Sequence, residues 1–363
     1  ILNQELSLYK EKFLALGAAG IILDVTTGEI LALSSLPDFD PNDGKGPLSK
    51  VELNRILQGS YELGSGFKTF TIASGLDNNV IRQVDSYDAT YPLRVGGFTI
   101  RDDHPKKRWL SVQEIFVYSS NIGTIKIAQD IGIEIQKEFF EKLGLFSKTK
   151  IEVFEKTSPQ LPKQWGPTEL ATTAYGHGIA VTPLHLASGV AAMVNGGRLI
   201  PATLIRKDIV PAALLNFVSS KVKPDNTSRQ VISSKTSEIM RKLLHFAVEE
   251  GTGKKSKVEG YEIGGKTGTA IKPFENKRGY DDKAVISSFI SIFPINDPKY
   301  LIFAMLDEPQ GIEETFNLIS AGMTAAPLVG NIISRVGPLM GIPTTHKGEK
   351  EYDDFMLVSG TRK

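Results

Sequence analysis

Cysteine is absent from this sequence of 363 residues, which excludes disulfide bonds and thiolate chemistry. No run of about 18 consecutive apolar residues occurs, so no segment is expected to span a bilayer. The formal net charge is only +1, with 42 basic and 41 acidic residues. The composition therefore gives no broad electrostatic reason to expect binding to nucleic acid or to an acidic membrane surface.

Metal-ligand and phosphate-binding patterns are also missing. The five histidines show no metal-ligand spacing: His104, His177, His185, His245 and His346. No glycine-rich phosphate loop of the Walker type is present. We therefore expect neither a metal nor another cofactor. The sequence is 41% hydrophobic and 23% charged, which is enough for a sizeable core.

Strand-like segments lie near both ends of the sequence, and helical segments lie between them. Residues 20–25 and 29–33 flank a turn that contains glycine, which predicts a hairpin. Further strands are expected at residues 261–269, 284–293 and 300–307. Helices are expected at residues 6–16, 113–145 with breaks at 119–121 and 132, 184–194, 234–250 and 325–336. This order predicts an α+β fold in which both ends build one antiparallel sheet around a helical insertion.

The first of three short motifs is Ser65-Gly66-Phe67-Lys68. Ser-x-x-Lys occurs four times, starting at Ser7, Ser65, Ser147 and Ser220, so the pattern alone has little specificity. Context favours Ser65, because glycine lies on both sides and a helix is expected to begin there. One helical turn then places Lys68 on the same face as Ser65.

Two further motifs follow in the order of the chain. Ser119-Ser120-Asn121 alone is typical of a helix cap. Lys266-Thr267-Gly268-Thr269 alone is typical of a threonine-rich edge strand, although Gly268 would also allow a ligand to approach the backbone closely. Together the three motifs supply a hydroxyl nucleophile, a base, a proton relay and an anion-binding wall. They predict a serine acyl-transfer site.

With these motifs the sequence resembles the class B penicillin-binding proteins, which are monofunctional peptidoglycan D,D-transpeptidases. The likeness extends from about residue 17 to 341, with supporting stretches at 24–32, 37–42, 61–65, 181–187 and 307–309. Residues 321–327 look most like the division-specific, septal branch. The middle motif has Ser120 in place of Asp, which fits class B proteins and fits class A β-lactamases poorly. Gly66 stands where the branch more often has Thr.

The resemblance implies the penicillin-binding and serine β-lactamase-like transpeptidase fold as a single catalytic domain over residues 1–363. Its sheet part is expected at about 17–74 and 212–341, and its helical part at about 75–211. The polar residues 342–363 form a tail that is expected to be loosely ordered from His346. Because the chain opens without Met, we expect a fragment that lacks the family's membrane anchor and its non-catalytic N-terminal module.

The family mechanism assigns roles to the three motifs. Ser65 attacks the D-Ala-D-Ala amide of a stem peptide, Lys68 accepts its proton, and Ser119 relays a proton to the leaving amine. Asn121 holds Lys68 and the substrate amide. Lys266, Thr267, Gly268 and Thr269 form the wall that binds the terminal carboxylate. Lys266 is also the second cation that lowers the pKa of Lys68, and the N–H groups of Ser65 and Thr269 form the oxyanion hole.

The partners implied are stem peptides as donor and acceptor, β-lactam antibiotics, a separate glycosyltransferase and division proteins. The implied location is the periplasmic face of the bacterial inner membrane.

Three alternatives to a transpeptidase remain: a serine β-lactamase that uses Glu169, a β-lactam sensor, and a scaffold with a decaying site. His177 is interpreted as a structural loop histidine rather than a cleft residue, and residues 101–104 as a solvated loop.

Overall fold

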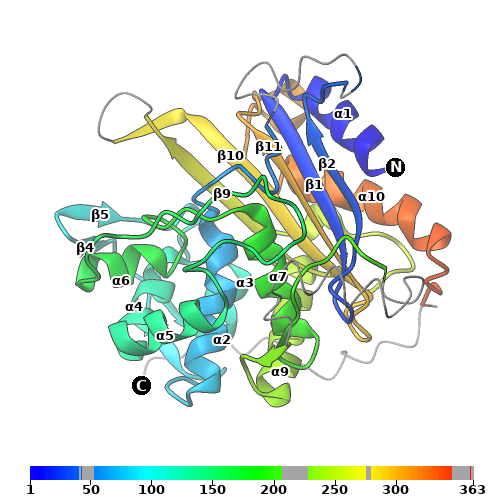
Figure 1. The fold of residues 1–363 in the computed structure, drawn as a ribbon. Coiled ribbons are helices and arrows are strands. Elements are labelled where there is room, and N and C mark those ends of the chain that lie inside the picture. Colours follow the sequence, from blue (N-terminus) through cyan, green and yellow to red (C-terminus); the bar gives the residue numbers. More distant parts are fainter. Residues whose placement is uncertain (41, 43–52, 207–227, 275–278, 346–359, 361–363) are drawn as a thin grey trace.

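One five-stranded antiparallel sheet organises the computed structural model, which describes residues 1–40, 42, 53–206, 228–274, 279–345 and 360 (Figure 1). The strand order is β2 (Ile30–Leu36), β1 (Gly17–Asp24), β11 (Tyr300–Asp307), β10 (Tyr280–Phe293) and β9 (Gly264–Pro273). The N-terminal hairpin thus joins the three C-terminal strands, and the predicted α+β fold with one antiparallel sheet is confirmed. β9 forms one edge of this sheet.

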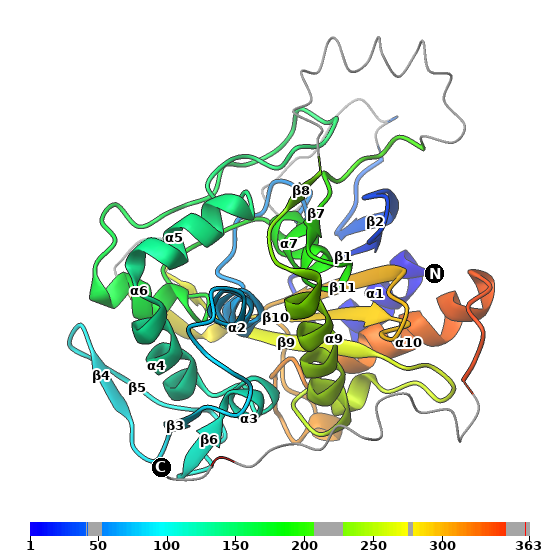
Figure 2. The same cartoon turned by 90° about the horizontal axis from the view of Figure 1, so that it is seen from below.

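Both faces of the sheet are covered by helices. α1 (Leu2–Lys12) and α10 (Ala325–Leu339) pack on one face, where Leu6, Ile22 and Ile332 belong to one buried apolar cluster (Figure 1). The larger helical part packs on the other face (Figure 2). Since β1 is apolar along nearly its whole length, it can lie buried between two layers.

The helical part is built mainly from α3 (Val112–Val117), α4 (Asn121–Ile131), α5 (Ile133–Lys142), α6 (Pro167–Thr173), α7 (Pro183–Val194) and α9 (Ser234–Glu249). Of these helices, α9 lies outside the range of about 75–211 in which the helical part was expected. The predicted interruptions at residues 119–121 and at Gly132 separate α3, α4 and α5. At the start of α7, Thr182 accepts a hydrogen bond from the backbone N–H of His185, and Pro183 occupies the first helical position. The predictions for α3, α4, α5, α7 and α9 are confirmed, whereas α6 was not predicted.

The middle of the chain also contains strands that the sequence patterns did not predict. Three short pairs occur there: β3 (Ser86–Asp88) with β6 (Trp109–Ser111), β4 (Leu93–Val95) with β5 (Phe98–Ile100), and β7 (Arg198–Leu199) with β8 (Arg229–Gln230). Segments of two or three residues are too short to show an alternating pattern. The first helix also begins and ends four residues earlier than the predicted 6–16, because residues 13–16 connect it to β1. The predicted tail from His346 lies outside the described residues, apart from Gly360.

A central helix carries the first motif. The short 3₁₀ turn η2 (Gly64–Phe67) leads directly into α2 (Lys68–Asp77), whose residues 68–76 are all buried. α2 contacts α4, α7 and α9, so it is surrounded by the helical part (Figure 2). The predicted helix after Ser65 is therefore present, and its first residue, Lys68, lies inside the protein.

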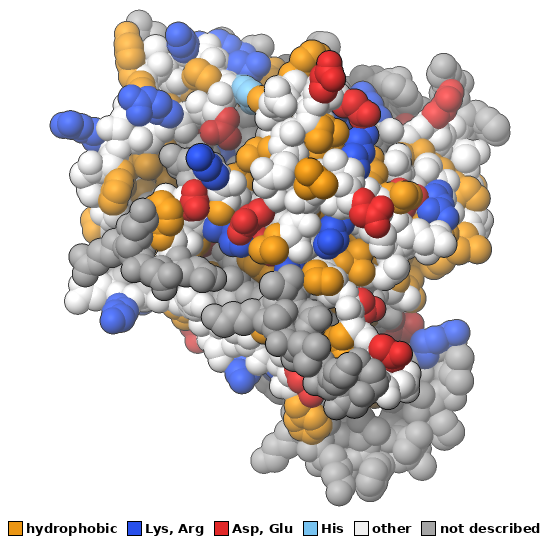
Figure 3. Space-filling view, turned by 90° about the horizontal axis from the view of Figure 1, so that it is seen from above, with side chains coloured by type: hydrophobic (Ala, Val, Ile, Leu, Met, Phe, Trp, Pro, Cys, Tyr) orange, Lys and Arg blue, Asp and Glu red, His pale blue; other side chains and the backbone are white. Residues whose placement is uncertain are grey.

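The charges of the surface are mixed. On the face shown in Figure 3, Lys and Arg side chains alternate with Asp and Glu side chains, and no large area carries one sign. This agrees with the formal net charge of +1.

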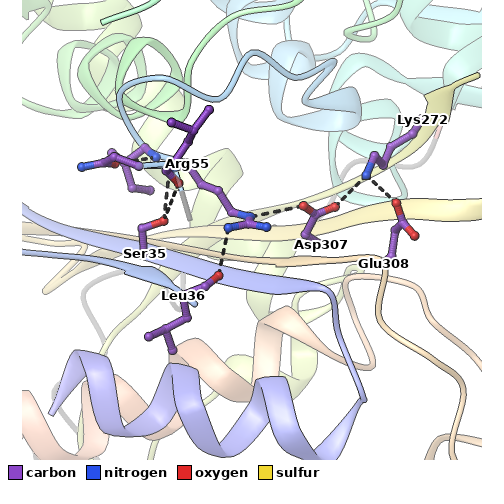
Figure 4. A network of polar contacts seen from close by, with 9 residues as sticks. Ser35, Leu36, Arg55, Lys272, Asp307 and Glu308 are labelled. Carbon is purple, nitrogen blue, oxygen red and sulfur yellow. Dashed lines mark hydrogen bonds and ion pairs between the residues drawn. The ribbon is translucent and has the colours of Figure 1, made fainter. Parts of the chain in front are cut away.

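A buried ion-pair network ties the segment before η2 to the sheet (Figure 4). Arg55 Nε lies 3.2 Å from Asp307 Oδ2, and the Arg55 guanidinium also donates to the Leu36 carbonyl oxygen at 3.0 Å. On the other side of Asp307, Lys272 Nζ lies 3.0 Å from Oδ1 and 2.5 Å from Glu308 Oε1. Because Lys272 belongs to β9, the network joins β9 and β11 to the chain that leads into the first motif.

Replacing Asp307 by alanine is expected to lower the free energy of unfolding by about 3–5 kcal/mol, because it removes the carboxylate that the buried guanidinium of Arg55 contacts. Only 5% of the Arg55 side chain and 6% of the Asp307 side chain are exposed. Chemical denaturation measures the change. The control is Asp297→Ala, which removes an exposed ion pair with Lys299 and should cost less than about 1 kcal/mol. Equal losses of unfolding free energy in Asp307→Ala and Asp297→Ala would show that the network stabilises the fold no more than an exposed ion pair does.

Candidate active site

Close backbone packing fixes the position of Ser65. η2 lies against β9, and a Cβ atom added to Gly64 would lie 2.7 Å from the carbonyl oxygen of Thr269. Gly64 also has φ of +54°, a conformation that favours glycine. A Cβ atom on Gly268 would likewise lie 2.7 Å from the carbonyl oxygen of Leu63. The two glycines therefore let the turn that carries Ser65 approach the strand that carries the third motif.

Lys68 lies on α2 one residue after η2, and its side chain is completely buried. Its Nζ atom lies 2.5 Å from the carbonyl oxygen of Ser119 and 2.7 Å from Asn121 Oδ1. The same atom lies 3.0 Å from Ser119 Oγ. The structure thus joins the first and second motifs through the amine of Lys68.

The second motif forms the junction between α3 and α4. Ser120 is the N-cap of α4, since its hydroxyl accepts a hydrogen bond from the N–H of Gly123 at 3.0 Å. Ser119 has φ of +60°, which is uncommon for a residue other than glycine and marks local strain. The ordinary interpretation as a helix cap therefore holds for Ser120, while Ser119 and Asn121 on either side of it contact Lys68.

Lys266 also reaches the hydroxyl of Ser119. It lies on β9, it is buried, and its Nζ atom lies 2.9 Å from Ser119 Oγ. Two further residues of the third motif are held by neighbouring loops: the hydroxyls of Thr267 and Thr252 lie 2.7 Å apart, and Thr269 Oγ1 accepts the N–H of Ala321 at 3.0 Å. All three motifs thus meet, with Ser119 Oγ between two lysines.

Burial shifts the pKa of both lysines downward. Desolvation lowers the pKa of Lys68 to about 8, against the attraction of Asp102 and Asp103. The pKa of Lys266 is lowered well below its ordinary value, first by burial and second by the positive charge of Lys68. Two cations within reach of one hydroxyl disfavour each other, so a neutral amine near physiological pH is accessible here.

The hydrogen-bond partners of Lys68 suit a neutral amine. The carbonyl oxygen of Ser119 can only accept, and so can Asn121 Oδ1, whose orientation is fixed because Asn121 Nδ2 donates to the Arg101 carbonyl oxygen at 3.0 Å. These two acceptors use two N–H groups. A neutral amine then keeps its lone pair to accept a proton from a hydroxyl, which is what a general base requires.

Asp102 supports this junction, and the sequence interpretation missed it. Its carboxylate accepts hydrogen bonds from Ser120 Oγ at 2.7 Å and from the N–H of Ile122 at 3.0 Å. The prediction of a solvated loop is therefore wrong for Asp102, because a partly buried carboxylate holds the start of α4. The contacts span 18 and 20 residues, so no local pattern announced them.

Replacing Asp102 by alanine is expected to lower the free energy of unfolding by about 1–2 kcal/mol, because it removes two hydrogen bonds at the start of α4. Thermal or chemical denaturation measures the loss. Asp103→Ala is the matched control, since it removes the exposed neighbouring carboxylate. The assignment would be contradicted by a stability loss for Asp103→Ala as large as that for Asp102→Ala.

Two negative findings concern the described residues only. No helix in that part of the chain is long and apolar enough to cross a membrane. No group of three or more His, Cys, Asp or Glu side chains gathers there in a way that could hold a metal ion.

Comparisons with known proteins identify the family of the chain. The model of the penicillin binding protein transpeptidase domain matches residues 18–333. Among curated proteins, the probable peptidoglycan D,D-transpeptidase FtsI of Caulobacter vibrioides is 38% identical over 94% of this chain and 57% of its own length. The stage V sporulation protein D of Bacillus subtilis is 33% identical over 97% of this chain and 54% of its own length.

Among solved structures, the transpeptidase domain of penicillin-binding protein 3 from Burkholderia pseudomallei is 28% identical, with a TM-score of 0.79 and coverage of 95% of both chains. The chain spans only a little over half the length of the two curated relatives. The family model, in contrast, covers most of the chain and includes all three motifs. The chain therefore belongs to the penicillin-binding protein transpeptidase domain family.

Proposed function

We propose that this chain is a peptidoglycan D,D-transpeptidase that works through an acyl-enzyme on Ser65. The observation that carries the proposal is the meeting of Lys68 and Lys266 at the single hydroxyl of Ser119, beside the turn that holds Ser65. The name of one curated relative, a probable peptidoglycan D,D-transpeptidase, supports the assignment to cell-wall chemistry.

In the first half-reaction Ser65 Oγ attacks the carbonyl carbon between the two terminal D-alanines. The hydroxyl proton passes to the neutral amine of Lys68 as the C–O bond forms. The negative charge that develops on the carbonyl oxygen is stabilised by the N–H groups of Ser65 and Thr269. The C–N bond then breaks, and Ser119 passes a proton from Lys68 to the departing D-alanine amine.

The third motif positions the donor. Lys266, Thr267 and Thr269 bind the terminal carboxylate, with Gly268 letting the backbone come close, and Asn121 holds the substrate amide as well as Lys68. A β-lactam presents a similar amide and carboxylate, so it acylates Ser65 and remains attached. In the second half-reaction an amine of a neighbouring stem peptide attacks the acyl group, and its proton returns through Lys68 to Ser65.

The biological setting is part of the same proposal. The FtsI name of one relative and the likeness of residues 321–327 to the septal branch support a role in septal wall synthesis. Such a role places the site on the periplasmic face of the inner membrane, in a full-length protein with an anchor and a non-catalytic module. It also requires a separate glycosyltransferase and division proteins as partners.

The position of Glu169 speaks against the β-lactamase alternative. Deacylation by a β-lactamase needs a carboxylate that activates water beside the acyl-serine. The carboxylate of Glu169 instead accepts the N–H of Gly166 at 3.0 Å and caps the start of α6. Its side chain is thus used to stabilise a helix end, and a long-lived acyl-enzyme is the expected outcome.

Intact-protein mass spectrometry after incubation with benzylpenicillin tests the proposal. We expect one adduct on the wild type that persists for many minutes, and none on Ser65→Ala. Ser147→Ala is the matched control, because Ser147 also begins a Ser-x-x-Lys pattern but is exposed, and it should keep the adduct. Adduct formation on Ser65→Ala would disprove the assignment of the nucleophile. Rapid release of hydrolysed drug would favour a β-lactamase.

A further inference from the structure

A cavity of about 210 Å³ lies between the end of α5, the start of α7 and the β7–β8 pair (Figure 2). We call it the α7 cavity. None of the described residues that line it belongs to the three motifs. An apolar cavity of about 150 Å³ is large enough to hold benzene, so the α7 cavity has room for a single ring that carries a short substituent.

Helix α7 stands between this cavity and the turn that carries the first motif. Three residues of α7 line the cavity: Leu184, His185 and Ser188. Leu186 lies about half a turn further round the helix than Leu184. It packs on the turn, because a Cβ atom added to Gly66 would lie 3.1 Å from Leu186 Cδ2. The α7 cavity is therefore separated from the candidate active site by the thickness of a helix.

The inner wall of the α7 cavity is apolar. Leu143, Leu184 and Ala202 line it and are buried. His185 adds no free polar group, since its Nε2 atom lies 2.8 Å from the carbonyl oxygen of Ser147 and its Nδ1 atom lies 2.8 Å from the hydroxyl that caps α7. Burial also lowers the pKa of His185, so the ring is neutral near physiological pH. This wall favours an apolar group, which displaces water from it.

The mouth of the α7 cavity is basic. Three exposed cations line it, namely Lys148, Lys150 and Arg229. Among the described residues that line the cavity, the opposing acidic side chain is Glu141, which is also exposed. Because cations outnumber carboxylates around an opening with low-dielectric walls, the mouth attracts an anion rather than a cation.

The guanidinium of Arg229 is held at the mouth by one of its nitrogens. Arg229 Nε donates to the carbonyl oxygen of Lys142 at 2.7 Å. A Cβ atom added to Gly144 would lie 3.4 Å from Arg229 Nη2, so the guanidinium lies beside a residue that lines the cavity. Within the described residues no carboxylate pairs with Arg229. Its two Nη groups therefore remain to bind a carboxylate through two parallel hydrogen bonds.

We propose that the α7 cavity binds a small amphipathic carboxylate, with its apolar body against Leu143, Leu184 and Ala202 and its carboxylate on the guanidinium of Arg229. Each half of such a ligand matches one part of the cavity. A neutral ligand of the same shape loses the charge-assisted hydrogen bonds, and a carboxylate without an apolar body loses the burial of apolar surface. The site goes beyond the proposed function, since it requires no acylation of Ser65.

Isothermal titration calorimetry with three probes tests the site. The probes are 3-phenylpropionate, its neutral counterpart 3-phenylpropionamide, and acetate, which lacks the ring. We expect 3-phenylpropionate to bind the wild type with a Kd below about 1 mM. The amide should bind about 10-fold more weakly, because it loses the hydrogen bonds between guanidinium and carboxylate. Acetate should bind too weakly to be measured, because it buries almost no apolar surface.

Two variants locate the probe. Arg229→Gln should weaken binding of 3-phenylpropionate about 10-fold and leave binding of the amide unchanged. Ala202→Leu places extra methyl groups in the cavity, so it should weaken both probes by at least about 10-fold. Arg94→Gln is the matched control, because it changes an exposed arginine on β4 that does not line the cavity, and it should keep both wild-type constants. Thermal unfolding without probe shows whether each variant is folded.

Four results would overturn the site. They are no binding of 3-phenylpropionate up to about 10 mM, equal affinity of the wild type for acid and amide, unchanged binding of the acid by Arg229→Gln, and full binding by Ala202→Leu. The last result would place the probe elsewhere, for instance at Lys266. If Ala202→Leu does not fold, the ratio of the two constants in Arg229→Gln decides the question by itself. None of these results bears on acylation of Ser65, so the proposed function stands or falls separately.

Discussion

Replacing Lys68 by methionine is expected to slow the acylation of Ser65 by benzylpenicillin by about 10³-fold, because general base catalysis contributes about 10²–10⁴-fold to such a step. Methionine fills a similar volume but cannot accept the proton that the proposed mechanism transfers from Ser65. It also leaves the carbonyl oxygen of Ser119 and Asn121 Oδ1 without the donor that they share in the wild type. The rate constant is measured by intact-protein mass spectrometry at a series of drug concentrations.

The pH dependence identifies the group that titrates. Since burial lowers the pKa of Lys68 to about 8, the wild-type acylation rate should rise with pH through about 8 as the amine becomes neutral. In Lys68→Met this rise should disappear from the residual rate. A rate that keeps the same rise in Lys68→Met would show that another group is the base. The control is Lys254→Met, which changes an exposed lysine and should leave both rate and profile unchanged.

Protein stability should depend on pH in the direction that a depressed lysine pKa requires. The pKa of Lys68 is about 8 in the folded chain and 10.5 as its ordinary value. Between these values the unfolded chain binds more protons than the folded chain, so this residue makes folding more favourable as the pH rises from about 8 to 10.5. Below about 8 the charged amine remains buried and its cost is fully present.

Local sequence patterns predicted the parts of the site but not their assembly. Ser65 and Lys68 are one helical turn apart, so helix geometry relates them directly. Ser119 lies 51 residues from Lys68 and 147 from Lys266, and its hydroxyl is shared by both lysines only because the fold brings α2, α4 and β9 together. Without the resemblance to a known family, nothing in the residues themselves would have placed Ser119 between two amines.

The fold shows the same division between local and long-range information. The hairpin near the N-terminus and the three C-terminal strands follow from alternation and turn residues. The order of strands does not, because β1 pairs with β11 across nearly the whole chain, with Gly17 opposite Asp307. Asp102 was missed for a related reason: it lies in a loop, and its partners are 18 and 20 residues distant.

Gly268 was expected to let a ligand approach the backbone. The structure shows that other parts of the chain also pack closely against Gly268. A Cβ atom at this position would lie 2.7 Å from the carbonyl oxygen of Leu63 and 2.6 Å from Ser288 Oγ. The hydroxyl of Ser288 has some freedom to turn away, but the carbonyl of Leu63 is backbone that leads into η2. An added methyl group therefore has to push the turn that carries Ser65 away from β9.

Replacing Gly268 by alanine is accordingly expected to slow acylation of Ser65 by about 10²-fold, because the two proposed oxyanion donors, the N–H groups of Ser65 and Thr269, move apart and one donor is lost. Gly97→Ala is the control: it forces a side chain into φ of +86°, but its Cβ atom meets nothing within 4 Å. It should therefore lower stability without slowing acylation. Equal rates in Gly268→Ala and the wild type would mean that the spacing between η2 and β9 does not set the oxyanion hole. If Gly268→Ala is acylated slowly but keeps the wild-type pH profile, the general base and the oxyanion donors are separate requirements of the proposed mechanism. In that case Lys68 still acts as the base, while the donors that stabilise the transition state are misplaced.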